Sequence, residues 1–149
     1  MTGASGFAAR TGHERFDELP ADRQNQVAQA WESLLQIRRL TQAGEPELPA
    51  PWERNRPLQA VGLALEALGV EFAGVDDAGA VVRSGVRLTE ERRGVVRAEW
   101  VHRRGERPTD GGDARLAEAA EAAGRAGWDA LLYRAGRSRY LLIEPGRTT

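Results

Sequence analysis

Residues 95–103, VVRAEWVHR, decide the fold because their side chains divide into two chemically different faces. Side chains alternate between the two sides of a β-strand. One side then carries valine, alanine and Trp100, and the other carries Arg97, Glu99 and Arg103. We therefore predict a half-buried strand whose Trp100 side packs under helices and whose arginine side meets water.

The segments around this strand predict a mostly antiparallel sheet. EFAGV (71–75) and AVVRSGVRL (80–88) are rich in valine and are separated by DDAG, which has the composition of a tight turn. With 95–103 they predict a three-stranded meander. WDALLYRA (128–135) and RYLLIEP (139–145), separated by GRS, predict a closing hairpin.

Two helices are predicted within this body. PLQAVGLALEALG (57–69) is almost entirely apolar and ends at a glycine, and an alanine-rich helix begins near Asp110 or Asp113. The order α-β-β-β-α-β-β predicts an α+β fold of two layers. This order is similar to that of secretion-chaperone-like domains, which bind other proteins, and its first five elements resemble those of a double-stranded-RNA-binding domain.

The chain before this body divides into three predicted segments. Residues 1–15 are small and polar without a period and predict a disordered tail, and 16–44 predict an amphipathic helix. Residues 45–56 are rich in proline and predict an extended connector. The α+β domain is then 57–146.

Apolar side chains recur at three-to-four spacing in the N-terminal helix and form a stripe. This stripe either covers the chain's own core or lies in the groove of a protein partner or of a second copy, as in a homodimer. The candidate protein-binding residues are Val27, Trp31, Leu34 and Arg38.

Composition sets limits on location and chemistry. Cysteine is absent, which removes disulfides and thiolate chemistry and favours a cytoplasmic location. Lysine is absent too, and arginine with abundant alanine, glycine and valine is typical of a bacterial, high-GC genome. No window has the apolar length of a membrane span. We expect no cofactor and no metal.

Residues 83–107 contain eight arginines against four acids, although the whole chain has a formal net charge of −1. Alternation places several of these arginines on one sheet face, where guanidinium groups suit a phosphate backbone. That face offers no aromatic ring for base stacking, and interleaved glutamates could neutralise it. The candidate nucleic-acid-binding residues are Arg83, Arg87, Arg92, Arg93, Arg97, Arg103, Arg104 and Arg107.

Catalytic patterns are scarce. The four serines lie in no nucleophile motif, and His13 and His102 are isolated in sequence. RRGERPTDGGDARL (103–116) resembles the acyl-CoA loop of the acetyltransferase superfamily, but Gly111 and Gly112 depart from its spacing. We predict a non-enzymatic binding or adaptor protein that acts through a protein partner or self-association. The alternatives are a nucleic-acid-binding protein and an acyl-CoA-dependent acyltransferase.

Overall fold

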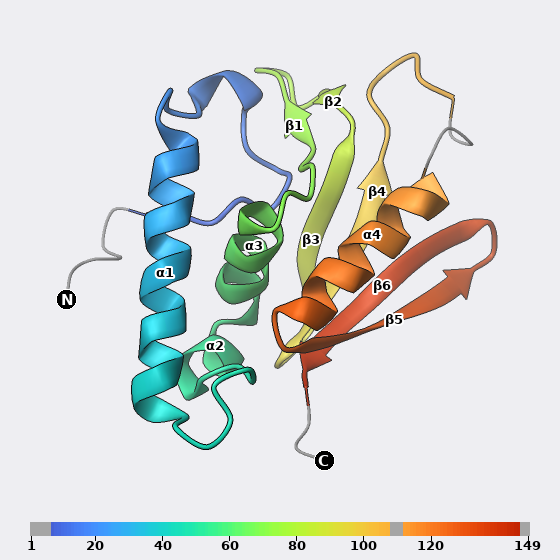
Figure 1. Ribbon diagram of the computed structural model, residues 1–149. Helices are drawn as coiled ribbons and strands as arrows, with labels where there is room; N and C mark the ends of the chain where they lie inside the picture. Colours follow the sequence, from blue (N-terminus) through green and yellow to red (C-terminus); the bar gives the residue numbers. More distant parts are fainter. Residues whose placement is uncertain (1–6, 108–111, 147–149) are drawn as a thin grey trace.

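The computed structural model describes residues 7–107 and 112–146, which form an α+β fold (Figure 1). A short 3₁₀ helix, η1, spans Phe16–Glu18. The predicted α+β class, with a mostly antiparallel sheet and helices over it, is confirmed. The helices are α1 (Arg23–Thr41), α2 (Pro51–Asn55), α3 (Pro57–Ala67) and α4 (Gly112–Arg125), and the strands are β1 (Gly74–Val75), β2 (Val81–Arg83), β3 (Gly85–Arg92), β4 (Val95–Val101), β5 (Trp128–Ala135) and β6 (Ser138–Pro145).

The main sheet has the strand order β3-β4-β6-β5, and every neighbouring pair in it is antiparallel. β5 and β6 are the two arms of the predicted closing hairpin. β6 inserts between β4 and β5, so β5 lies at one edge of the sheet. Figure 1 shows α3 and α4 across one face of this sheet and α1 beside α3, farther from the sheet.

The predicted strand 80–88 and the three-stranded meander are corrected by the structure. The chain divides at Ser84: β2 pairs with β1 in a separate two-stranded sheet, and β3 pairs with β4. At Gly85 a Cβ atom would collide with the backbone of Phe72 and Ala73. The close crossing of two chain segments at this glycine explains why one apolar run serves two sheets.

The predicted register of 95–103 is confirmed. Val96 and Ala98 are fully buried, and Trp100 packs against the same core. Val86 and Leu88 of β3 join them, because β3 lies in register with β4 as Val86↔Trp100 and Leu88↔Ala98. Leu141 and Ile143 of β6 are buried in the same cluster. This side of the sheet is the core face, and the opposite side is called the open face below.

Helix α1 packs its apolar stripe inside the molecule, which is the first of the two alternatives that the sequence leaves open. Val27 and Leu34 are buried against Leu63 of α3, and Trp31 is partly buried beside them. Arg38 is 2% exposed. A partner could reach Val27, Leu34 and Arg38 only if α1 separated from α3, whereas Trp31 is partly accessible.

The predicted tail and connector are more structured than expected. Residues 1–6 lie outside the described part of the chain, but residues from Phe7 onward pack against the body. The backbone N–H of Leu88 in β3 donates to the carbonyl of Thr11 at 2.7 Å. Gly12 adopts a φ of 91° where a Cβ atom would collide with Arg87. Within the connector 45–56, residues Pro51–Asn55 form α2.

A buried ion pair joins three parts of the fold. Arg38 of α1 donates to both carboxylate oxygens of Glu53 in α2, at 2.8 and 2.7 Å, and the exposed fractions of the two side chains are 2% and 0%. Arg38 also donates to the carbonyl of Ala126 at 2.8 Å and to that of Glu47 at 3.3 Å. Bidentate geometry and two further carbonyl acceptors satisfy a guanidinium that is out of water.

We predict that Glu53→Gln lowers the free energy of unfolding by about 3–5 kcal/mol, because it leaves the Arg38 charge buried without its counter-charge. Urea denaturation measures this loss. Glu32→Gln is the matched control, since Glu32 pairs with Arg39 at 3.1 Å on the exposed side of α1 and such a pair contributes about 0–1 kcal/mol. Equal losses in the two variants would contradict the prediction.

Candidate interaction surface

The two edges of the main sheet are treated differently. Along the β3 edge, Val86 donates its N–H to the carbonyl of Glu71 and accepts from the N–H of Ala73, and Leu88 donates to Thr11. Segments 71–73 and 11–12 therefore cover that edge from Val86 to Leu88. At the other edge, β5 pairs with β6 and with no further strand of the described chain.

Exposed apolar side chains gather on the uncovered strand. Leu131, Leu132 and Tyr133 are consecutive in β5 and are 60%, 54% and 41% exposed. Because they alternate in direction, Leu131 and Tyr133 lie on the open face and Leu132 lies on the core face beyond the helices. We call these three residues the β5 edge surface. Long, apolar and unprotected edges are templates for pairing with another chain.

The open face next to this edge carries both rings and charges. Its side chains follow from the register Arg97↔Leu142↔Leu131 and from Tyr133↔Tyr140. The rings of Tyr133 and Tyr140 stack at 5.7 Å, and the Arg97 guanidinium lies 3.7 Å from the centre of the Tyr140 ring. Arg97 also pairs with Glu99 at 3.0 Å and with Glu91 at 3.7 Å.

The expectation that this face lacks aromatic rings is therefore wrong. Alternation within a strand predicts which of its side chains share a face. It could not predict which face of the final hairpin lies on the same side of the sheet as the arginines of β4. The pairing of β4 with β6 sets this relation, and it brings Tyr140 under Arg97.

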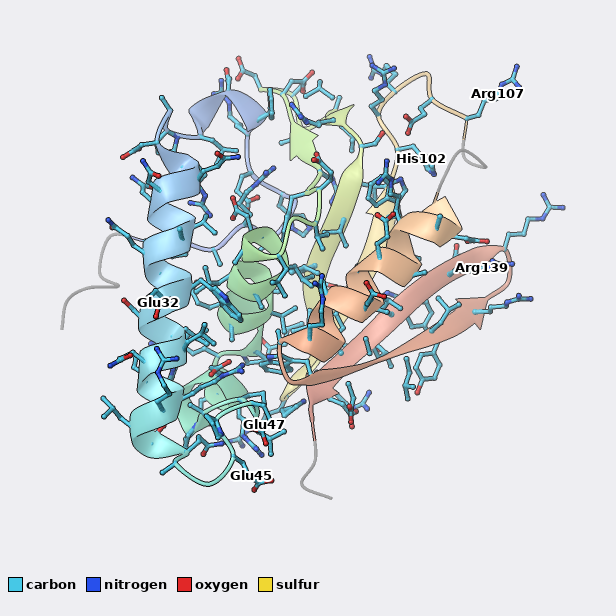
Figure 2. All side chains as sticks on the ribbon, viewed as in Figure 1. Glu32, Glu45, Glu47, His102, Arg107 and Arg139 are labelled. Carbon is cyan, nitrogen blue, oxygen red and sulfur yellow. The ribbon has the colours of Figure 1, made fainter. Side chains whose placement is uncertain are left out.

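The structure does not collect the eight candidate nucleic-acid-binding arginines on one surface. Arg87 and Arg97 lie on the open face, whereas Arg83 belongs to the small sheet and lies over the ring of Phe16 at 4.6 Å. The remaining five are exposed and form two groups at opposite ends of β4. The seven residues of β4 separate these two groups by about 20 Å. Arg92 and Arg93 lie at the β3–β4 turn, and Arg103, Arg104 and Arg107 lie after β4. Figure 2 shows Arg107 projecting from the loop after β4.

A serine, a histidine and a glutamate meet beside β4 although they are distant in sequence. Ser84 donates to Glu106 at 2.5 Å, and His102 Nδ1 lies 2.9 Å from the same carboxylate oxygen. The backbone N–H of Arg103 donates to Ser84 Oγ at 2.8 Å. Sequence reasoning missed this cluster, because Ser84 stands 18 residues before His102 in the chain and only the pairing of β3 with β4 joins them.

This cluster has the residue types of a catalytic triad but not its arrangement. In a triad the imidazole lies between the hydroxyl and the carboxylate, and it accepts the hydroxyl proton. Here Glu106 lies between Ser84 and His102, so the serine donates to a carboxylate. The contacts tie the loop after β4 to the β2–β3 junction, and they supply no activated nucleophile.

The surface hollows beside α3 and between α3 and α4 have volumes of about 290 and 220 Å³, below the usual range of about 300–1,000 Å³ for ligand sites. Residues 7–107 and 112–146 contain no group of three metal-ligating side chains. Nor do they contain a helix of the length and apolar character that a membrane crossing needs. Residues 108–111 of the predicted acyl-CoA loop, Gly111 among them, lie outside the described chain, and Gly112 begins α4.

Comparison with known proteins found no match to a protein-family model, to a curated protein or to a solved structure. The functional argument therefore depends on the surface itself.

We predict that Ser84→Ala raises the pKa of Glu106. Hydrogen bonds from Ser84 and then His102 lower the pKa of this carboxyl in the folded chain. A depressed folded pKa gives stability that is present above the unfolded pKa and is lost as the pH falls through the folded pKa. Carbon-13 NMR titration of the Glu106 carboxyl measures the shift, and identical curves for wild type and variant would contradict the assignment.

Proposed function

We propose that this chain is a small non-enzymatic protein-binding module and that the β5 edge surface contacts its protein partner. The observation that carries the proposal is that three consecutive large apolar side chains, Leu131, Leu132 and Tyr133, are exposed on the one uncovered edge of the described sheet. Backbone pairing at a sheet edge supplies affinity, and alternate side chains supply specificity.

The energetics support a partner at this edge. Fully burying a leucine side chain is worth about 1.5–3 kcal/mol, and both leucines are more than half exposed. The strand also lacks the usual protection of edges, which consists of lysine, proline or a bulge. Arg134 is its one cationic side chain, near the hairpin tip.

The α1 stripe is not the proposed contact surface, because Val27, Leu34 and Arg38 are buried. The proposal keeps the predicted class of partner, another protein or a second copy, and moves the surface from α1 to β5. A cytoplasmic location remains a prediction from the absence of cysteine.

The two alternatives have less support. For nucleic acid, the open face offers Arg87, Arg97 and two tyrosine rings. Its carboxylates, Glu91, Glu99, Asp129 and Glu144, outnumber its guanidiniums and would repel phosphate. For an acyltransferase, neither hollow has the size of a substrate pocket.

We predict that a photoreactive amino acid at position 131 forms a discrete cross-linked product with a protein in the cells that express this chain. The same amino acid at position 40 is the matched control, because Leu40 is 76% exposed but lies on α1, away from β5. Denaturing gels and mass spectrometry identify the product and its attachment site. Absence of a product at 131, or equal products at 131 and 40, would contradict the proposal.

A further inference from the structure

The backbone groups on the outer side of β5 can be identified from its turn. The hairpin closes through Gly136 and Arg137, with Ala135 opposite Ser138, and Gly136 has a φ of 63°. In such two-residue hairpins the closing pair exchanges both hydrogen bonds, and hydrogen bonding alternates along the strand. The N–H and C=O groups of Ala130, Leu132 and Arg134 therefore point away from β6.

These outward groups are suited to pairing with the same strand of a second copy. A two-fold axis perpendicular to the sheet pairs the two strands in antiparallel fashion and keeps each side chain on its own face of the sheet. Residues that lie opposite each other across the interface must therefore both have even numbers or both have odd numbers. With the axis at Leu132, this residue meets its own copy and Leu131 meets Tyr133 across the interface. All three residues of the β5 edge surface then contact the second copy.

Charges at the two ends of β5 favour the antiparallel arrangement. Asp129 lies directly opposite Glu144 near the start of β5, and Arg134 lies opposite Arg139 near its end. Like charges directly opposite in a sheet are destabilising. Antiparallel approach brings the acidic end of one strand beside the hairpin turn of the other, which carries Arg137, whereas Arg134 projects from the core face, on the other side of the sheet from Asp129.

Helix α4 leaves room for this approach. Arg115, Glu118, Glu121 and Arg125 line the hollow toward α3. Helical periodicity places Ala117, Ala120 and Gly124 on the opposite flank, which faces the β5 side. A Cβ atom at Gly124 would meet nothing within 4 Å, so no side chain obstructs a second sheet there.

We propose that the partner at the β5 edge is a second copy of this chain, joined by antiparallel pairing of the two β5 strands with Leu132 on the two-fold axis. This inference rests on the proposed function and names the partner for the same surface. The result is one continuous eight-stranded sheet in which both uncovered edges have disappeared.

Light scattering after size exclusion, over a concentration series, tests the dimer. We expect wild type to have twice the mass of the 16.3 kDa chain. Leu132→Pro removes an outward N–H and leaves the β5–β6 ladder intact, a position where edge strands tolerate proline. We expect it to raise the dimer dissociation constant at least about 30-fold, the effect of losing a 2 kcal/mol hot spot.

Leu132→Glu repeats this test without a backbone change, and Leu40→Glu is the matched control for adding an acid at an exposed leucine. Circular dichroism checks that each variant folds. Wild type that remains at 16.3 kDa up to its solubility limit would overturn the homodimer. Folded Leu132→Pro and Leu132→Glu that both dimerise like wild type would overturn the β5 interface.

Single cysteines test the geometry, since the chain has none of its own. A short bis-maleimide should join two copies of Leu132→Cys. It should not join copies of Leu142→Cys. Position 142 lies on the open face of β6, and the β6 strands of the two copies are three strand spacings apart, about 14 Å or more. Cross-linking at position 142 but not at 132 would contradict edge pairing and would indicate that two copies stack through their open faces. A photo-cross-link from position 131 to a different protein, with a monomeric chain, would overturn the homodimer and leave the proposed function standing.

Discussion

The buried pair of Arg38 with Glu53 is the contact on which the arrangement of the other elements depends. It joins α1 to α2, and through the carbonyl of Ala126 it reaches the chain just before β5. Gly127, at a φ of 95°, approaches the backbone of Glu47 so closely that no side chain would fit there. The start of β5 is thus held by ionic and backbone contacts from the helical layer. The rest of the strand extends past that layer, which leaves Leu132 exposed on the core face, whereas Leu131 and Tyr133 are exposed because no helix covers the open face.

The arginine-rich middle of the sequence has mainly a structural explanation. Arg97 is held by two glutamates and a tyrosine ring, and Arg83 lies over Phe16. A guanidinium can stack on a ring and pair with carboxylates at once. Arg97 in this way covers part of the main sheet's open face, which no helix covers, and Arg83 covers Phe16 beside the small sheet. The arginines that are close together in the sequence lie at separate places in the structure, on the open face and at the two ends of β4. An apolar edge, which composition does not reveal, is the more distinctive surface.

The sequence predicted what depends on local periodicity and missed what depends on distant pairing. Alternation was sufficient to place Trp100 inward and Arg97 outward, and turn residues located the β5–β6 hairpin. The division at Ser84 could not be predicted, because a crossing backbone near Phe72 causes it. The role of Arg38 was missed for a similar reason: its acceptors lie on α2 and after α4. Edge exposure also depends on strand order, and order is not encoded in any one segment.

The contrast between the two sheet edges carries the functional argument. The β3 edge is satisfied by backbone segments from 11–12 and 71–73, although ordering these irregular stretches costs conformational entropy. No comparable segment covers β5 in the described chain. Apolar side chains, Leu131 and Leu132 among them, surround its outward N–H and C=O groups and make that edge less favourable for water. A strand that combines unpaired backbone groups with apolar side chains on both faces gains from pairing in two ways at once, through hydrogen bonds and through burial. Its two ends also carry opposite charge, Asp129 near the start and Arg134 near the hairpin tip, which is consistent with the antiparallel pairing proposed above.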